Sequence, residues 1–384
     1  MRARVLVVLP TQSYRATDFI EAAQALGVEL TIASESELPL VPPDRQVLID
    51  CSDPAASAAR VADLAAVTPI DAIVAAEDSG VEIAALASEL FGLPSSPVAA
   101  VRATLDKAVM RHLLARAEVA QPAFHVVDPA SVAQAAAQIG FPVVTKPRTR
   151  SASVGVMRAD DSHAVIEAAA LAARHQQEDD GSERFLVERF VSGPEISVEG
   201  LIWDGVVETL AIFDKPDQPD GPVFPETILV TPTSLPPATV AEVERTVTAA
   251  THALGLTQGP IHAELRIEND VPNVLEIAGR TIGGLCGRSL TFGLMGDSLE
   301  SLVLRQALGE RKRGSKRLPG ATGVLMIPVP RNGTLTSVDG IDEAESVPGV
   351  TSIEISIPVG ADVKPTPDGD RYLGFVFARS QTPS

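Results

Sequence analysis

The segment that decides the fold of this chain reads GPIHAELRIENDVPNVLEIAGRTIGG, from Gly259 to Gly284. Two apolar runs in it, IHAELRI and PNVLEIA, predict strands, and the turn-rich ENDVPN between them predicts a hairpin. Glu264 and Glu276 lie inside these apolar strands, where an unpaired carboxylate is costly to bury. We therefore expect both carboxylates to be paired with a cation or bound to a metal.

A divalent metal is one candidate partner for these two glutamates. Carboxylate oxygens on neighbouring strands suit a hard cation such as Mg²⁺, which binds a few carboxylates together with phosphate oxygens. Arg280 follows just beyond the second strand, where its guanidinium could clamp a carboxylate or a phosphate, and Gly283 and Gly284 let a ligand approach the backbone. The alternative is a structural ion pair between Glu276 and Arg280, because buried ion pairs also occur without function.

A lysine at the end of an earlier predicted strand marks a second candidate site. Lys146 ends the strand PVVTK and precedes Pro147, which stops the hydrogen-bond ladder. Such a lysine can meet phosphate oxygens as a point charge, and a solvated lysine at a strand end is the alternative. Arg148 and Arg150 follow it in the chain, and we expect them to contact phosphate or to close a lid.

The segment FLVERFVSGPEISVEG carries two further acidic residues at strand ends. Glu188 follows a buried run, and the apolar residues and free backbone groups after it could receive a flat base. Glu195 could then reach a ribose hydroxyl through charge-assisted hydrogen bonds. An exposed acidic strand end explains the same pattern equally well.

Composition and charge restrict the class of protein. The chain has 384 residues, enough for roughly two or three domains, and its 45% hydrophobic and 21% charged residues are typical of globular proteins. The net charge of −19 argues against nucleic acid as a partner, because duplex binding needs a basic surface. Cys51 and Cys286 are far apart and have no histidines at ligand spacing, so we expect a reducing compartment without disulfides or zinc.

The hydropathy of the chain predicts a cytoplasmic protein that does not enter a membrane. No apolar run reaches the roughly 18 residues that a membrane helix needs. The opening MRARVLVVLP has an apolar run too short for a signal-peptide core, and we interpret it as a first strand.

The pattern along the chain predicts several structural segments. Residues 1–100 alternate apolar runs with helical patterns, which predicts a doubly wound parallel sheet of Rossmann-like shape. The first turn, PTQSYRATD, contains no glycine, so we do not expect this sheet to hold a dinucleotide. Residues 101–308 contain further helices and most of the strands. A basic, glycine-punctuated linker at 309–320 leads to a small β-rich module at 321–380.

Taken in order, these segments resemble the ATP-grasp superfamily and, within it, the L-amino acid ligases and related carboxylate–amine ligases. The resemblance implies an ATP-grasp fold of the α/β, multidomain class. It implies a Rossmann-like N-terminal domain over 1–100 and an ATP-grasp domain over 101–308, whose lid covers about 141–200. Residues 309–384 would form the linker and a small β-rich C-terminal domain.

The resemblance also assigns site residues. For ATP it implies Lys107 in TLDKAVMRHLLARAEVAQP, Lys146 in FPVVTKP, Ser153 in SVGV, Glu188, Phe190, Val191 and Glu195 in VERFVSGPEISVEG, and Lys215. For Mg²⁺, or Mn²⁺ in its place, it implies Glu264 and Glu276. For the substrates it implies Glu77, Glu226 in FDKPDQPDGPVFPETILVTP, His262, Arg280, Gly283 and Gly284. Arg280 and Lys146 are the residues implied to be catalytic.

The sequence departs from the family pattern in two places. Many relatives have Glu-x-Asn at the second metal position, whereas this chain has Glu276-Ile-Ala278, so the metal would rely on Glu264 and Glu276. Amino acid ligases often have a histidine three residues after the loop glutamate, where this chain has Leu229, and the amine substrate stays open. His262 shares a strand face with Glu264 and is the nearest polar alternative, unless it is a buried, hydrogen-bonded structural histidine.

The resemblance implies three substrates, namely ATP, a small carboxylic acid and a small amine, with amino acids as the acid and the amine. The carboxylate would attack the γ-phosphorus to give an acyl phosphate, and the amine would then displace phosphate to form an amide. Glu77, at the carboxyl end of a predicted strand, could contact the amine or cap a helix together with Asp78. Other interpretations are an ATP-grasp carboxylase, a phosphoribosyl-amine ligase or a nucleotide-binding protein without catalysis. A homodimer is the expected assembly.

Overall fold

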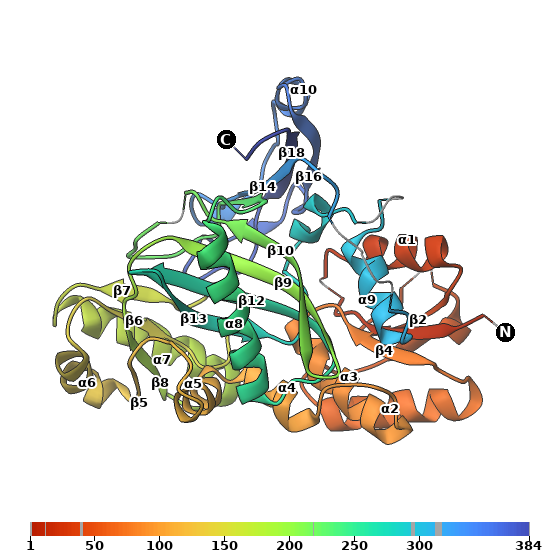
Figure 1. Ribbon diagram of the computed structural model, residues 1–384, viewed down its shortest axis with the longest axis horizontal. Helices are drawn as coiled ribbons and strands as arrows, with labels where there is room; N and C mark the ends of the chain where they lie inside the picture. The colour runs from red at the N-terminus through yellow and green to blue at the C-terminus, as the bar shows by residue number, and fades with distance from the viewer. Residues whose placement is uncertain are drawn as a thin grey trace.

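The computed structural model describes residues 2–11, 13–38, 41–217, 219–292, 296–311 and 317–383. The predicted linker at 309–320 therefore falls partly outside the described residues. In Figure 1 a large central sheet separates the N-terminal segment on the right from a small lid sheet on the left, and the C-terminal strands lie above. This is the multidomain α/β arrangement that the sequence predicts, whereas the domain boundaries at 100 and 308 stay a prediction.

A four-stranded parallel sheet with the order β3-β2-β1-β4 forms the N-terminal segment. Its strands are β1 (Arg4–Val8), β2 (Glu29–Ser34), β3 (Gln46–Leu48) and β4 (Ala72–Ala75), and its helices are α1 (Ala16–Leu26), α2 (Pro54–Val67) and α3 (Asp78–Phe91). Val5 and Val7 pack into one apolar cluster, and Leu6 and Val8 pack into another. Both faces of the sheet are therefore covered, as expected for parallel strands, and the predicted Rossmann-like shape is confirmed.

The lid is a four-stranded antiparallel sheet with the order β5-β8-β6-β7. Its elements are β5 (Phe124–Val127), β6 (Val143–Lys146), β7 (Met157–Ala159), β8 (Phe185–Arg189), α6 (Val132–Ile139) and α7 (Ala164–Asp180). Alanines along α7 let the helix pack closely on this sheet, and four of its six alanines are buried. Two helices, α4 (Val98–Leu105) and α5 (Lys107–Arg116), connect the N-terminal segment to the lid.

The central sheet has eight strands in the order β13-β12-β9-β10-β11-β14-β18-β16. They are β9 (Glu195–Trp203), β10 (Val206–Asp214), β11 (Ile228–Thr231), β12 (Gly259–Glu268), β13 (Val271–Ala278), β14 (Ala321–Ile327), β16 (Val350–Ile355) and β18 (Gly374–Ser380). The helices α8 (Pro237–Leu254), α9 (Leu299–Ala307) and α10 (Ile341–Glu345) and the short pair β15 (Gly333–Thr334) and β17 (Asp362–Val363) complete the fold. The hairpin predicted at 259–284 is β12–β13, and its turn is Asn269–Asp270, where φ is 53° and 64°.

Apart from the short pair β15–β17, the C-terminal strands join the central sheet. β11 pairs antiparallel with β14, from Ile228 opposite Leu325 to Thr231 opposite Thr322, so β14, β18 and β16 extend the central sheet. One apolar cluster joins β1 to β10, α9 and β18, since it contains Val5, Phe213, Leu299 and Phe375. N-terminal, central and C-terminal segments thus share a core.

Two further observations concern the sequence-based expectations. In the part of the chain that the structure describes, no helix combines the length and apolar character needed to cross a membrane. Cys51 and Cys286 are both free thiols, and Cys286 is buried against Met326, with 3.6 Å between the two sulfur atoms.

Candidate active site

The acidic hairpin brings a row of charged side chains onto one face of the central sheet. The pairing of β12 and β13 places Glu264 opposite Glu276. The pairing of β12 and β9 places His262 opposite Glu199, Glu264 opposite Ser197, and Arg266 opposite Glu195. Side chains at every second position of a strand point to the same face, so these residues form neighbouring rows.

A buried lysine lies among three carboxylates at the centre of this face. The Lys215 ammonium is 2.8 Å from Glu195 and from Glu226, and 2.9 Å from Glu264. Oxygen atoms of these three glutamates lie within 4.8 Å of one another. One cation could therefore contact all three, and a single ammonium balances only part of their charge. The donor set fits a hard divalent metal.

The protonation of this cluster is strongly perturbed. Burial raises the pKa of Glu226 to about 7, although Lys215 acts in the opposite direction. Against the effect of burial, Lys215 and His262 hold the pKa of Glu264 well below its usual range.

Of the two predicted metal ligands, Glu264 belongs to the cluster, whereas Glu276 pairs with Lys107 at 3.2 Å. Glu195 and Glu226 were predicted for other roles; β9 brings Glu195 beside Glu264, and the loop before β11 brings Glu226.

A cavity of about 160 Å³ lies between the lid and the central sheet. The residues predicted to bind ATP that line it are Lys107, Lys146, Ser153, Glu188, Phe190, Val191 and Glu195. The remaining predicted ATP contact, Lys215, lines a neighbouring cavity instead. The rings of Phe190 and Phe224 stack with their centroids 6.4 Å apart, and Leu275 adds a further apolar surface. Such a slot suits a flat aromatic base.

Lys146 and Glu188 form a buried charge pair inside this cavity. The Lys146 ammonium is 2.7 Å from Glu188 Oε2, and Arg111 Nε donates to Glu188 Oε1 at 2.6 Å. Burial lowers the pKa of Lys146 to about 8, and Glu188 offsets part of this effect. Glu188 therefore holds Lys146 and Arg111 in position. Arg111 was not predicted as a site residue, because its partner Glu188 lies 77 residues farther along the chain and no local spacing connects the two.

The two arginines after Lys146 anchor the loop that covers the cavity. Arg148 is 2.6 Å from Asp106, and the carbonyl of Arg150 accepts a hydrogen bond from the Lys107 ammonium at 2.5 Å. Farther along the loop, Ala152 and Ser153 have φ values of 54° and 57°, a region that favours small or flexible residues. The expectation that Arg148 and Arg150 contact phosphate or close the lid stays a prediction.

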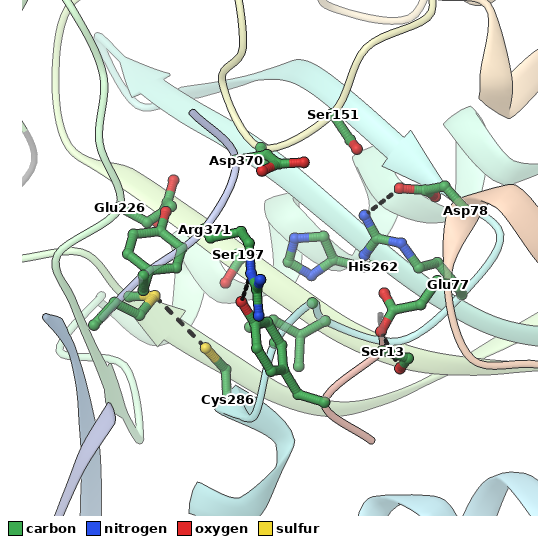
Figure 2. Close-up of a pocket in the computed structure, with 18 of the residues that line it drawn as sticks. Ser13, Glu77, Asp78, Ser151, Ser197, Glu226, His262, Cys286, Asp370 and Arg371 are labelled. Atoms are coloured by element: carbon green, nitrogen blue, oxygen red, sulfur yellow. Dashed lines mark hydrogen bonds and ion pairs between the residues drawn. The ribbon is translucent and has the colours of Figure 1, made fainter. Parts of the chain in front are cut away.

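A second cavity, of about 310 Å³, adjoins the first (Figure 2). All of the residues predicted to bind substrate line it, namely Glu77, Glu226, His262, Arg280, Gly283 and Gly284. Figure 2 shows side chains entering from three parts of the chain: Ser13, Glu77 and Asp78 from the N-terminal segment, Ser151 from the lid, and Asp370 and Arg371 from the C-terminal segment. Leu229, Met326 and Phe375 supply an apolar wall.

Arg280 is held at the edge of this cavity by the start of helix α3. It donates to Asp78 at 2.7 Å and to the carbonyl of Thr281 at 2.9 Å. Its Nε is buried, and it has no hydrogen-bond partner among the described residues. The predicted alternative of a pair between Arg280 and Glu276 does not form, because Glu276 pairs with Lys107. Glu77 does not cap α3 through its side chain and instead accepts a hydrogen bond from Ser13 at 2.7 Å.

His262 lies between two glutamates. Its Nδ1 is 2.5 Å from Glu199 Oε1, and its Nε2 is 3.5 Å from Glu264 Oε1. Burial acts to lower the pKa of His262, but the Glu199 carboxylate outweighs it and raises the pKa to about 9. The imidazole therefore carries a positive charge at neutral pH. Leu229, where relatives often have a histidine, is 2% exposed and contributes only apolar surface.

Several residues of the second cavity were not found by sequence reasoning. They are Ser13, Tyr14, Ser151, Ser197, Cys286, Met326, Asp370, Arg371, Tyr372 and Phe375. Half of them, namely Ser13, Tyr14, Asp370, Arg371 and Tyr372, come from loops near opposite ends of the chain, and no spacing relates them. Ser197 is an exception, because it lies between Glu195 and Glu199 on an apolar strand, and that alternation is visible in the sequence.

The two cavities share one wall. Its residues are Ser151, Ala152, Glu226, His262, Glu264 and Arg280. The side chains of this wall can therefore contact a group bound in either cavity. The shared wall combines carboxylates, an imidazolium and a guanidinium, which suits phosphate chemistry assisted by a metal.

Comparisons with known families match three parts of the sequence. Residues 20–95 match the ATP-grasp N-terminal domain, residues 139–289 match the ATP-grasp domain, and residues 325–384 match the L-amino acid ligase C-terminal domain 2. Among solved structures, the L-amino acid ligase from Bacillus licheniformis is 26% identical with a TM-score of 0.81, over 100% of this chain and 94% of that chain.

Comparison with curated sequences gives further relatives. The uncharacterized protein y4rH of Sinorhizobium fredii is 29% identical over 299 residues, which are 75% of this chain and 59% of that protein. The chain thus spans less than two thirds of the y4rH protein. A D-alanine–D-alanine ligase from a Synechococcus strain is 28% identical over 256 residues, which are 62% of this chain and 74% of that enzyme.

Proposed function

This chain belongs to the ATP-grasp ligases, in the L-amino acid ligase branch, and we propose that it joins a carboxylic acid to an amine through an acyl phosphate formed with ATP. The observation that carries this proposal is the wall shared by the two cavities. An acyl phosphate made at that wall stays within reach of an amine in the second cavity. Amino acids are the proposed acid and amine, as the names of the Bacillus and Synechococcus relatives suggest.

The first step would take place at the boundary between the cavities. A carboxylate oxygen of the acid attacks the γ-phosphorus of ATP, the bond from that phosphorus to the β,γ-bridging oxygen breaks, and ADP leaves. Lys107 and Lys146 lie where they could hold phosphate oxygens, and the Lys146 charge is maintained by Glu188. The protein contributes position and positive charge rather than a covalent intermediate of its own.

The second step would form the amide. The amine nitrogen attacks the acyl carbon, the bond from that carbon to the phosphate oxygen breaks, and phosphate leaves. We assign Glu226, which lines both cavities, as the group that receives the proton lost by the amine. Arg280, through its unpartnered Nε, and the His262 imidazolium would stabilise the negative charge that develops on the acyl oxygen.

A divalent metal completes the proposal. Glu264 and Glu276 would hold Mg²⁺, or Mn²⁺ in its place, with Glu195 and Glu226 nearby. When bound, the metal neutralises phosphate charge. The Lys215 ammonium lies among the same carboxylates and would then be free to turn toward phosphate.

The test is a reaction screen with the full-length chain. Mg·ATP is mixed with amino acids singly and in pairs, with and without bicarbonate, while phosphate release and amide formation are both measured. We expect one phosphate released for each amide formed, and only when acid and amine are both present. Glu276→Gln should lower turnover on the order of 100-fold, while Glu242→Gln, on the surface of α8, should not.

Other outcomes would favour the competing functions. Phosphate release that depends on bicarbonate would point to a carboxylase, and release that depends on a phosphoribosyl amine would point to that class of ligase. Nucleotide binding without phosphate release in any combination would contradict an enzyme and favour a protein that only binds ATP. The homodimer and the cytoplasmic location stay predictions, and light scattering would show whether the particle has twice the 40.2 kDa mass of the chain.

A further inference from the structure

A fully buried carboxylate, that of Glu199 in β9, lies behind the wall of the second cavity. Its exposed fraction is 0%, and it is not among the described residues that line either cavity. Burying a carboxylate is costly unless hydrogen bonds or cations compensate it. Glu199 does not reach a bound substrate, so its function depends on the groups that it holds.

One oxygen of Glu199 fixes the orientation of His262. The two residues lie opposite each other on β9 and β12, and His262 Nδ1 donates to Glu199 Oε1 at 2.5 Å. Because this contact holds one side of the ring, the other ring nitrogen, Nε2, faces the shared wall, where it lies 3.5 Å from Glu264. The direction of the imidazole is thus set from behind, by a residue outside both cavities.

The second oxygen of Glu199 fixes a peptide group beside Arg280. Glu199 Oε2 accepts a hydrogen bond from the backbone amide of Ile282 at 3.0 Å. The carbonyl of that same peptide group belongs to Thr281, and it accepts a hydrogen bond from Arg280 at 2.9 Å. Because a peptide group is planar and its N–H and C=O point in opposite directions, holding the N–H also aims the carbonyl at the guanidinium. Glu199 therefore orients Arg280 through a single peptide group.

We propose that Glu199 is a positioning residue for amide formation, which holds the His262 imidazole and the Arg280 guanidinium in one fixed arrangement toward the acyl oxygen. This inference rests on the proposed ligase function, in which both groups stabilise the charge on that oxygen. A carboxylate suits the role because both of its oxygens accept hydrogen bonds, whereas an amide offers one acceptor and one donor. Such support from behind keeps active-site groups in a productive geometry.

The experiment uses two substitutions of Glu199. Glu199→Gln keeps the size of the side chain, but whichever way its amide lies, one of the two contacts is lost. Glu199→Asp keeps both acceptor oxygens on a shorter side chain. Glu208→Gln is the matched control, because Glu208 lies on the neighbouring strand β10 and is not among the described residues that line either cavity. Steady-state amide formation and calorimetric ATP binding are measured for each variant.

We expect Glu199→Gln to lower kcat for amide formation about 10- to 100-fold, the loss typical of residues that orient an active-site group. The dissociation constant of ATP should change less than about twofold, because Lys107 and Lys146 pair with other glutamates. Glu199→Asp should recover part of kcat, and Glu208→Gln should match wild type in both measurements. A loss of ATP affinity as large as the loss of kcat would indicate a structural role and overturn the proposal.

A double-mutant cycle with His262→Asn tests whether Glu199 acts through the imidazole. The asparagine amide can still donate to Glu199, so the carboxylate keeps a partner while the second ring nitrogen is lost. The loss of kcat in the double variant should be smaller than the product of the two single losses. Losses that simply multiply would overturn the role of Glu199 toward His262.

Hydrogen exchange tests the contact with Ile282 without any substrate. In Glu199→Leu, which removes both acceptors, the Ile282 amide should exchange faster than in wild type, while the amides of β14 and β18 should not. Unchanged exchange, or an equal rise throughout the central sheet, would overturn the positioning role. If wild type forms no amide with any substrate pair, the proposed ligase function fails; if it forms amides and Glu199→Gln leaves kcat unchanged, only the role of Glu199 fails.

Discussion

Lys146 is a buried cation whose charge depends on one neighbour. Its side chain is 8% exposed, and its ammonium lies 2.7 Å from Glu188. Burial pulls the pKa of Lys146 down from its ordinary value to about 8, and the nearby Arg111 and Lys107 charges act in the same direction. Because the shift is downward, the ammonium is charged below pH 8 and becomes neutral above it in the nucleotide-free protein.

The affinity for ATP should therefore depend on pH through Lys146. We expect the dissociation constant of ATP to rise as the pH increases through about 8, since a neutral lysine no longer attracts phosphate. Calorimetric titrations from pH 6.5 to 9.5 would measure this. Lys146→Met should bind ATP more weakly at neutral pH and lose most of the rise. A rise of the same size in Lys146→Met would contradict the assignment.

Individual site residues could be predicted where the chemistry is local. A glutamate inside an apolar strand, such as Glu264, or a lysine before a proline, such as Lys146, reveals an unusual environment in the sequence itself. Arg111 and Arg371 could not be found in this way. Their partners, Glu188 and Tyr14, come from distant segments, and only the packed structure brings them together.

The turn between β8 and β9 depends on one glycine. Gly193 has a φ of 91°, and a Cβ built on it would lie 2.0 Å from the carbonyl oxygen of Ile267 in β12. The neighbouring Pro194 carbonyl accepts a hydrogen bond from the Ile267 amide at 3.0 Å. This close backbone contact positions the start of β9, where Glu195 joins the carboxylate cluster.

Gly193→Ala should consequently destabilise the protein more than an alanine at a roomier glycine. Gly181, at the end of α7, has a φ of 75° but nothing within 4 Å of its Cβ position, so Gly181→Ala is a matched control. We expect Gly193→Ala to lower the free energy of unfolding by roughly 2 kcal/mol more than Gly181→Ala. Denaturant titrations of both variants would measure the difference. Equal losses would show that backbone strain alone, and not the contact with Ile267, governs both sites.

Elements with strong periodicity could be predicted from sequence, whereas their neighbours in the sheet could not. The hairpin at 259–284 was predicted from two apolar runs and the turn residues between them. The pairing of Ile228–Thr231 with the C-terminal strand β14 has no local signal, because the two segments are distant in sequence. Strand order depends on which apolar faces pack together, and that is a property of the whole fold.

A buried arginine connects three segments of the molecule. Arg15, at the start of α1, donates to Glu300 in α9 at 2.6 Å, to Thr281 after β13 at 2.5 Å, and to the carbonyl of Ala76 at 3.1 Å. The Arg15 and Glu300 side chains are 2% and 3% exposed, so neither charge has much contact with water. The pair links the N-terminal sheet to the segment that carries Arg280.

Removing one member of this pair should cost more than removing both. Glu300→Gln leaves a buried guanidinium without its counterion, and we expect the free energy of unfolding to fall by about 3–5 kcal/mol. The double variant Arg15→Met and Glu300→Leu should recover most of that loss, because apolar side chains of similar size can replace a buried ion pair. A double-mutant cycle measured by denaturant unfolding tests this. A double variant as unstable as Glu300→Gln would contradict it.

Because the eight-stranded sheet is continuous, truncating this chain before its C-terminal strands would expose a sheet edge. In a truncated chain that ends before β14, the backbone amides and carbonyls along one edge of β11 would face solvent, whereas β14 covers this edge in the intact chain. Unprotected edges of this kind recruit strands from other molecules and promote aggregation. The strand that β14 protects begins two residues after Glu226, a member of the carboxylate cluster. The C-terminal strands thus protect a sheet edge and also supply part of the wall of the second cavity, and deleting them would expose the loop that carries Glu226 together with the edge.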